Sequence, residues 1–233
     1  SSFYINGSAA PVTSPVNAKI RVFLEGPYYS GNMSTGISSV LPLTQPFQGS
    51  PFYYAGTEQV TSIPAGVTDW ILVELRTDPW SLSRVASRAG FIKSDGMITD
   101  VDGASDLHFS GLPGGYYYLV VRHRNHLPVM SALPVSVTST GILYDFTTGS
   151  APVYGGAGGC KLIDPTLSKW GMIAGDANQS SSVYVDDYTD FWLPQFGNSL
   201  YTPGDFNMDG SVYINDYTDY WMINFGRVST CPN

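Results

Sequence analysis

The sequence is poor in charged residues, which make up only 13% of its 233 residues. Acidic residues outnumber basic ones 19 to 11, and no basic cluster occurs, which argues against a nucleic-acid binder. No apolar run reaches the roughly 18 residues that a membrane-spanning helix needs. The GxSxG, HExxH and P-loop motifs are absent, and the only glutamates, Glu25, Glu58 and Glu74, share no local motif. We therefore expect no enzyme.

Glycine, proline and tyrosine are abundant instead, with 25, 16 and 16 residues. This mixture favours β-structure with many turns over helical bundles. The 43% of hydrophobic residues suffices for a buried core. The start at Ser1, without Met or a signal-like segment, leads us to expect a processed chain.

Short strands without amphipathic helices between them predict a β-sandwich. The segment GLPGGYYYLVVRHRNH, residues 111–126, resembles the closing hairpin of transthyretin-like or carboxypeptidase-regulatory-like β-sandwich modules, which bears on the fold and not on chemistry. We interpret its basic end, Arg122 to His126, as an exposed strand end. The predicted strands are 19–25, 57–63, 70–76, 85–93, 97–100, 106–110, 116–124, 133–138 and 142–146.

Four regions follow from composition. Residues 1–16 form an N-terminal strand, Ser2–Ile5, and a linker; residues 17–147 form the β-sandwich domain; residues 148–159 form a Gly-rich linker; and residues 160–233 form a small α domain. Residues 1–150 carry 8 basic and 10 acidic side chains, whereas residues 151–233 carry 3 and 9. Most of the excess negative charge therefore lies in the last third.

That last third contains a repeat with an offset of 29 residues, and its second copy has the spacing of a calcium loop. Ca²⁺ takes six to eight oxygen ligands, and a 12-residue loop supplies them from alternate positions. Gly210 at position 6 permits the sharp turn, and Val212 at position 8 points into the core. The expected ligands are Asp205, Asn207 and Asp209 at positions 1, 3 and 5, the carbonyl of Ser211 at position 7, and Asp216 at position 12.

The first copy of the repeat has fewer of these features. Ser180 replaces the position-5 carboxylate, and Ser181 replaces the glycine at position 6. We expect weaker binding here, or a relic loop kept for packing. The candidate ligands are Asp176, Asn178, Ser180, Ser182 and Asp187.

Duplicated loop–helix units that end in Asp at position 12 resemble dockerin modules. The resemblance covers residues 174–227 and implies an extracellular module that folds with Ca²⁺ and attaches its host chain to a partner domain. Aromatic residues stand where dockerins usually have Leu and a basic residue, and they fill a two-helix core or form a docking patch. They are Tyr188, Phe191 and Trp192 in the first copy, and Tyr217, Tyr220 and Trp221 in the second. Pro194 cuts the first helix short. The whole arrangement also looks like the C-terminal region of large bacterial surface or secreted proteins.

Cys160 and Cys231 are the only cysteines, and both flank the predicted α domain. The even count and the expected processing suggest an oxidising compartment and one disulfide between them.

These features predict an extracellular or cell-surface structural or adhesive protein. It assembles with itself, as a homo-oligomer or fibril, or binds another surface protein, through the calcium-stabilised domain and the strand Ser2–Ile5. The alternative is a carbohydrate-binding or dockerin-type accessory module of a secreted hydrolase complex. In that case glycans would stack on Tyr53, Tyr54, Trp70 and Trp80.

Overall fold

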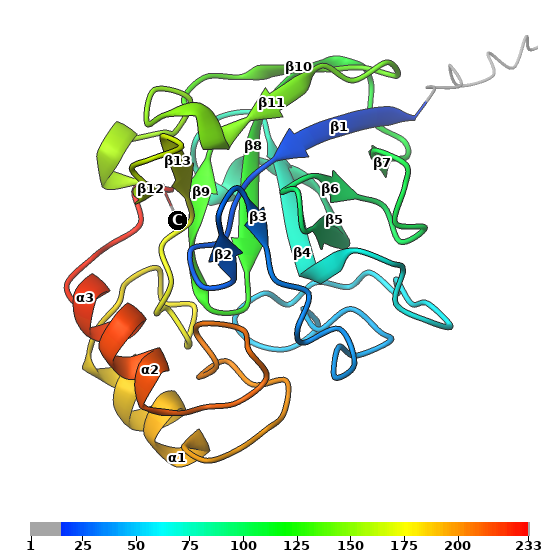
Figure 1. Cartoon of the computed structure of the whole chain (residues 1–233). Coiled ribbons are helices and arrows are strands. Elements are labelled where there is room, and N and C mark those ends of the chain that lie inside the picture. The colour runs from blue at the N-terminus through cyan, green and yellow to red at the C-terminus, as the bar shows by residue number, and fades with distance from the viewer. Residues whose placement is uncertain (1–14, 233) are drawn as a thin grey trace, which may run out of the picture.

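The computed structural model describes residues 15–232 and contains a six-stranded sheet, which Figure 1 shows at the centre of the molecule. Its central strand β4 is buried along its whole length, including its polar residues Asp69, Glu74 and Arg76. The strand order is β10 (Val135–Val137), β8 (Gly115–His123), β4 (Val67–Arg76), β5 (Arg84–Lys93) and β6 (Ile98–Thr99), and β9 (His126–Met130) also pairs with β8.

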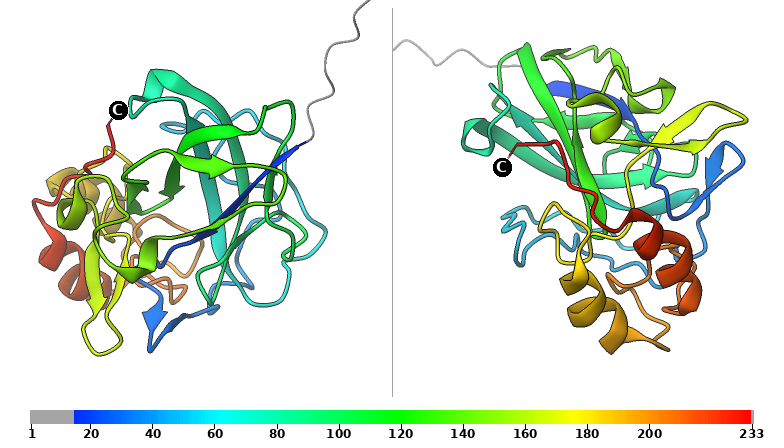
Figure 2. Two further views of the ribbon diagram at one scale, coloured as in Figure 1. Left: turned by 90° about the horizontal axis from the view of Figure 1, so that it is seen from above. Right: turned by 90° about the vertical axis from the view of Figure 1, so that its left-hand side faces the viewer.

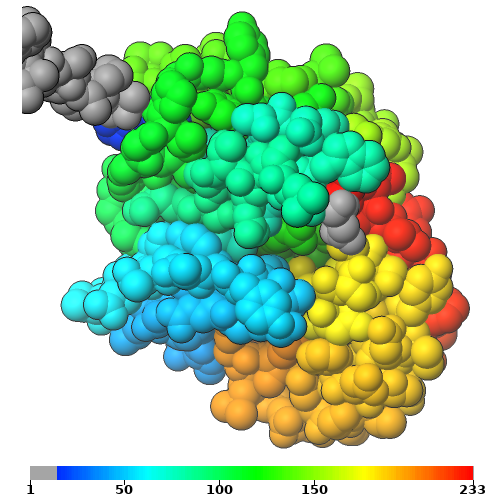
Figure 3. Space-filling view, turned by 180° about the vertical axis from the view of Figure 1, so that it is seen from behind, coloured from blue at the N-terminus to red at the C-terminus, as the bar shows by residue number. Residues whose placement is uncertain are grey.

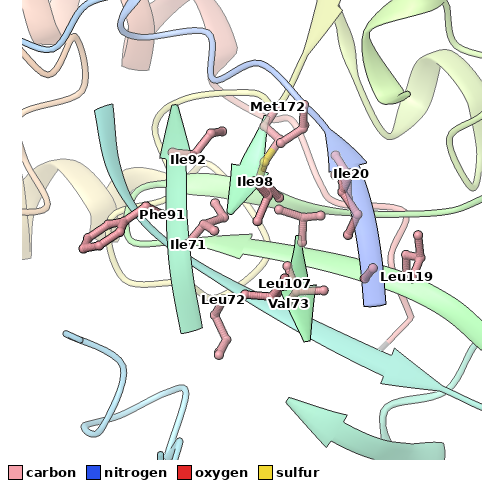
Figure 4. Close-up of a cluster of buried hydrophobic side chains, with 14 of the residues drawn as sticks. Ile20, Ile71, Leu72, Val73, Phe91, Ile92, Ile98, Leu107, Leu119 and Met172 are labelled. Carbon is pink, nitrogen blue, oxygen red and sulfur yellow. The ribbon is translucent and has the colours of Figure 1, made fainter. Parts of the chain in front are cut away.

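A three-stranded sheet packs on the same core. It consists of β11 (Leu143–Asp145), β1 (Val16–Arg21) and β7 (Leu107–Phe109), with β1 parallel to β11 and antiparallel to β7. Ile20 from this sheet and Ile71 and Leu119 from the larger one belong to one buried cluster (Figure 4). The prediction of a mainly β protein with a sandwich is therefore confirmed.

Two hairpins and three short 3₁₀ turns complete the β part. Residues 148–174 pack against the sandwich, since Val153, Cys160 and Met172 belong to its core cluster. The bounds are β2 (Tyr28–Tyr29), β3 (Asn32–Met33), β12 (Lys161–Asp164), β13 (Lys169–Gly171), η1 (Ser81–Ser83), η2 (Phe146–Thr148) and η3 (Gly156–Gly158).

Two helical segments lie side by side at one end of the sandwich (Figures 1 and 2). Each has a π-helical turn where its aromatic side chains are densest, a rare geometry that is frequent at functional sites. The first segment consists of η4 (Asp187–Trp192) and α1 (Leu193–Gln195), and the second of α2 (Ile214–Asp216), η5 (Tyr217–Trp221) and α3 (Met222–Asn224).

Pro194 does not shorten the first helix relative to the second. Both helices end at a Phe-Gly pair whose glycine, Gly197 or Gly226, has a φ of 84° or 85°. Glycine adopts this left-handed conformation without strain and commonly ends helices. The glycines, and not the proline, therefore set the helix ends.

Some strand predictions were wrong. Residues 57–63 form only an isolated bridge, Thr44 to Gln59. Strand β9 was not predicted; its sequence HLPVM contains a proline, which is rare inside strands. The predicted strand Ser2–Ile5 lies outside the described residues.

The predicted disulfide is also absent, since both cysteines are unpaired and buried. Cys160 packs in the sandwich core, whereas Cys231 packs beside Val120 and Met130 in a separate cluster. Burial raises the pKa of both thiols, that of Cys160 to about 11. Apolar packing and hydrogen bonds, such as those from Arg76 to the carbonyl of Pro232 and from Ser229 to the carbonyl of Pro128, hold the C-terminal segment against the sandwich without a covalent bond. None of the described helices is long and apolar enough to cross a membrane.

Candidate calcium-binding site

The two repeats form a pair of loop–helix units with reciprocal contacts. The indole Nε1 of Trp192 donates to the carbonyl of Tyr213 at 3.1 Å, and that of Trp221 donates to the carbonyl of Tyr184 at 3.0 Å. These pairs are related by the same offset of 29 residues. The units are thus packed as an approximate twofold pair.

Aromatic rings fill the space between the two helices. Tyr188 stacks on Trp192 with 5.3 Å between ring centroids, and Tyr217 stacks on Trp221 at 5.2 Å. Tyr188 also lies 5.2 Å from Tyr217, which joins the two stacks. Such pairs stabilise a core beyond their buried area. Of the two interpretations of these residues, the core packing is therefore confirmed.

Apolar side chains nevertheless remain exposed on these two helices, and four of them form corresponding pairs, Leu193 with Met222 and Phe196 with Phe225. Their exposed fractions run from 50% to 62%. They are Leu193, Phe196, Ile214, Met222, Ile223 and Phe225. We call this set the apolar fringe.

The second loop, residues 205–216, is wound around its own carboxylates. Asp205 accepts hydrogen bonds from the backbone N–H groups of Asp209 and Gly210, each at 3.1 Å. Asp216 accepts from the N–H groups of Asn207 at 3.0 Å and Tyr213 at 2.9 Å. Positions 1 and 12 are thereby drawn to the same loop interior.

The middle of the second loop has the predicted turn. Gly210 has a φ of 93°, and Val212 is fully buried. The N–H of Ser211 donates to Asp209 at 2.9 Å, so positions 5 and 7 lie together. Every candidate ligand predicted for the second loop therefore belongs to one hydrogen-bonded loop.

The first loop, residues 176–187, repeats this geometry. Asp187 accepts from the N–H groups of Asn178 at 3.1 Å and Tyr184 at 2.8 Å. Ser181 takes the place of Gly210 with a φ of 70°, and its N–H donates to Asp176 at 3.2 Å. The turn therefore forms without glycine. Ser180 and Ser182, the remaining candidate ligands, lie together, with their hydroxyl oxygens 2.9 Å apart.

Each loop buries two carboxylates completely: Asp176 and Asp187 in the first, and Asp205 and Asp216 in the second. Burial, opposed in part by Arg124 and reinforced by Asp216, raises the pKa of Asp205 to about 7. Burial raises the pKa of Asp187 and of Asp216 to about 6. Burial and the nearby Asp187 raise the pKa of Asp176 well above its usual value. A divalent cation would offset the cost of these buried charges.

The donor set fits Ca²⁺. The Oδ1 atom of Asp176 is buried and has no hydrogen-bond partner, as a ligand atom directed at a cation would be. Within residues 15–232, no three His, Cys, Asp or Glu side chains already converge in metal-binding geometry. A calcium loop does not require such a group, because amide and main-chain carbonyl oxygens supply several of its ligands.

The two-residue turn between β8 and β9 joins the sandwich to both loops. Asn125 donates through Nδ2 to the carbonyl of Asp205 at 2.6 Å, and Gln179 donates through Nε2 to the carbonyl of His126 at 3.3 Å. The guanidinium of Arg124 comes within 4.0 Å of the Asp205 carboxylate. The sandwich therefore contacts the interior of the calcium-type loops directly.

The expectation that residues 122–126 form an exposed strand end was wrong. His123 and His126 are fully buried, and their Nδ1 atoms lie 3.0 Å apart. Asp69, from β4, accepts from His123 at 3.1 Å and from Arg124 at 2.9 Å. This distant, buried carboxylate balances the basic side chains, which sequence reasoning from the local segment missed.

The four aromatic residues considered for glycan stacking do not form an exposed row. Trp70 is fully buried, and its Nε1 donates to the carbonyl of Pro42 at 2.7 Å. Tyr54 is partly buried and donates to Glu58 at 2.6 Å. Only Tyr53 and Trp80 are largely exposed, at 73% and 63%.

The segment of residues 40–60 adjoins the first calcium-type loop on the back of the molecule (Figure 3). A cavity of about 190 Å³ lies between them, lined by Phe52, Arg124, Gln179 and Tyr201 among others. This contact is a second junction between the sandwich and the helical pair.

No protein-family model and no curated protein matches the chain. Among solved structures, the chain is similar to two interface mutants of a type II cohesin–X-dockerin complex from Acetivibrio cellulolyticus. The N-terminal interface mutant has a TM-score of 0.43 and the C-terminal one 0.44. In both cases the identity is 16%, over 91% of this chain and 98% of the other. Similarity at this level assigns the chain to no family.

Proposed function

We propose that the chain is an extracellular, non-catalytic attachment protein, and that two Ca²⁺ ions order its helical pair, which resembles a dockerin. The observation that carries this proposal is the four completely buried aspartates, two in each loop. Uncompensated buried carboxylates are costly, and a bound cation removes that cost.

The attachment surface in this proposal is the apolar fringe. Exposed apolar groups that gather at one place commonly mark protein–protein contacts. The fringe lies directly on the helices that the loops precede, so calcium binding would fix its shape. The partner is another surface protein or a second copy of this chain. If it is another protein, the chain could belong to a secreted hydrolase complex.

Chelation of the full-length protein tests the calcium part. We expect native mass spectrometry to detect two Ca²⁺ ions per chain. We also expect EGTA to reduce the near-ultraviolet circular dichroism of the aromatic stacks while the β signal stays. A chain that binds no Ca²⁺ and has the same spectrum in EGTA would refute the proposal.

Sedimentation velocity tests the attachment part. If copies attach to one another, Ile223→Asp should abolish association of the full-length protein in Ca²⁺. Leu82→Asp is a matched control, because Leu82 is fully exposed on the sandwich. A chain that stays monomeric at every concentration would exclude attachment to itself and leave a different surface protein as the partner. Deletion of residues 1–16 would test the contribution of Ser2–Ile5 to any fibril.

A further inference from the structure

The two calcium-type loops differ at the positions that carry their third carboxylate. The second loop has Asp209 at position 5 and Asn215 at position 11. The first loop has Ser180 at position 5 and Asp186 at position 11. Both loops therefore contain three aspartates, but one carboxylate has moved from position 5 to position 11.

The relocated carboxylate makes the same contact as the one it replaces. In the second loop, Asp209 accepts a hydrogen bond from Nδ2 of Asn207, the position-3 residue, at 2.9 Å. In the first loop, Asp186 accepts from Nδ2 of Asn178, also at position 3, at 2.6 Å. One carboxylate thus holds the position-3 amide in each loop, from position 5 in the second loop and from position 11 in the first.

An independent feature indicates that the first loop binds a cation. Asp176, at position 1, is completely buried, and its Oδ1 has no hydrogen-bond partner. Its Oδ2 accepts from the N–H of Ser181 inside the loop. The orphaned oxygen therefore belongs to a carboxylate that is anchored within the loop, near Asp187.

We propose that Asp186 is a calcium ligand of the first loop and supplies the charge that Ser180 lacks. This inference rests on the proposed calcium function and adds a ligand to it. The number of carboxylates in a loop tunes its affinity for Ca²⁺. The first loop is then a second calcium site comparable to the other, and not a weakened relic.

Asp186 also lies near the start of a helix, where an acidic side chain stabilises the helix dipole without any metal. The two roles differ in their dependence on calcium. Loss of a dipole contact would lower stability equally in Ca²⁺ and in EGTA. Loss of a ligand would lower stability and affinity only when Ca²⁺ is present.

The test uses three variants of the full-length protein, titrated with Ca²⁺ against a chromophoric chelator, with native mass spectrometry for stoichiometry. Asp186→Asn should lower the affinity for one of two Ca²⁺ ions by about tenfold or more. The double variant Ser180→Asp/Asp186→Asn, which returns the carboxylate to position 5, should restore most of that affinity. Asp190→Asn, at an exposed position of the same helix, should change neither site.

The possible results separate this inference from the proposal on which it rests. A wild-type chain that binds no Ca²⁺ would overturn the proposed function itself. A chain that binds two ions, with Asp186→Asn indistinguishable from Asp190→Asn, would overturn the ligand assignment alone. A wild-type chain that binds one ion, unaffected by Asp186→Asn, would likewise exclude the assignment.

Discussion

Replacement of Asp69 by Asn is expected to destabilise the whole protein strongly. The Asp69 carboxylate is completely buried and accepts from Arg124 at 2.9 Å, from Tyr201 at 2.8 Å and from His123 at 3.1 Å. Asparagine would keep one acceptor but leave the buried guanidinium of Arg124 without its main counter-charge. The nearest remaining carboxylate is that of Asp205, at 4.0 Å.

Breaking a buried ion pair by removing one partner costs about 3–5 kcal/mol. That is a large part of the roughly 5–15 kcal/mol by which folded proteins are usually stable. For a chain of this size, each kcal/mol lowers the melting temperature by about 2–4 °C, so a fall of roughly 6–20 °C is expected.

Urea unfolding at neutral pH with saturating Ca²⁺, followed by tryptophan fluorescence, measures this loss. Asp190→Asn, an exposed replacement of the same chemistry, should change the unfolding free energy by less than about 0.5 kcal/mol. The double variant Asp69→Leu/Arg124→Met removes both charges and should be less destabilised than Asp69→Asn. A loss below about 1 kcal/mol for Asp69→Asn would refute the assigned role of Asp69.

Two further predictions concern acid and the junction between the sandwich and the second loop. Burial alone would raise the pKa of Asp69 and of Asp100, but Arg124 and Arg88, respectively, hold both below the usual 3.8. The stabilisation from these carboxylates is therefore complete above about pH 4 and is lost as the pH falls through their lowered pKa values. When the pH is lowered, the free energy of unfolding of Asp100→Asn should therefore fall less than that of the wild type. Gly26→Ala would place a Cβ atom 1.9 Å from the carbonyl oxygen of Phe206. It should lower the free energy of unfolding by about 1–3 kcal/mol and weaken Ca²⁺ binding at the second loop. Gly49→Ala, whose Cβ would have open space around it, should do neither. Unchanged calcium affinity in Gly26→Ala would show that the loop tolerates displacement from the sandwich.

The strands that could be predicted from sequence are those whose own residues indicate a buried strand. The strand predicted over 70–76 lies within β4, and the one over 85–93 nearly coincides with β5. The first contains the apolar run Trp70–Val73, which indicates burial without knowledge of the partner strand. The shape of the two loops was equally local, since each candidate ligand position is fixed by one 12-residue turn; that these positions bind Ca²⁺ stays a prediction.

The predictions that failed depended on distant partners. Whether His123 is buried depends on Asp69, which stands 54 residues earlier. Trp70 packs in the sandwich core, and a loop carbonyl accepts from its indole N–H, so its residue type alone could not show whether it is exposed. The even number of cysteines suggested a disulfide, but Cys160 and Cys231 pack in separate apolar clusters.

Both calcium-type loops are attached to a single turn of the sandwich, and this arrangement distinguishes the helical pair from an independent module. The backbone carbonyl of Asn125 accepts from the N–H of Gly175, just before the first loop, at 3.0 Å. The side-chain Nδ2 of Asn125 donates to the carbonyl of Asp205, where the second loop begins. One residue of the β8–β9 turn thus fixes the starting points of both loops. Many small modules fold only when metal binds, and the binding free energy must then offset the whole entropy of ordering their loops. In the proposed calcium-bound form, the sandwich would already order part of each loop, so less of the binding free energy of Ca²⁺ would be spent on folding. A change at Asn125 should then weaken Ca²⁺ binding at both proposed sites together.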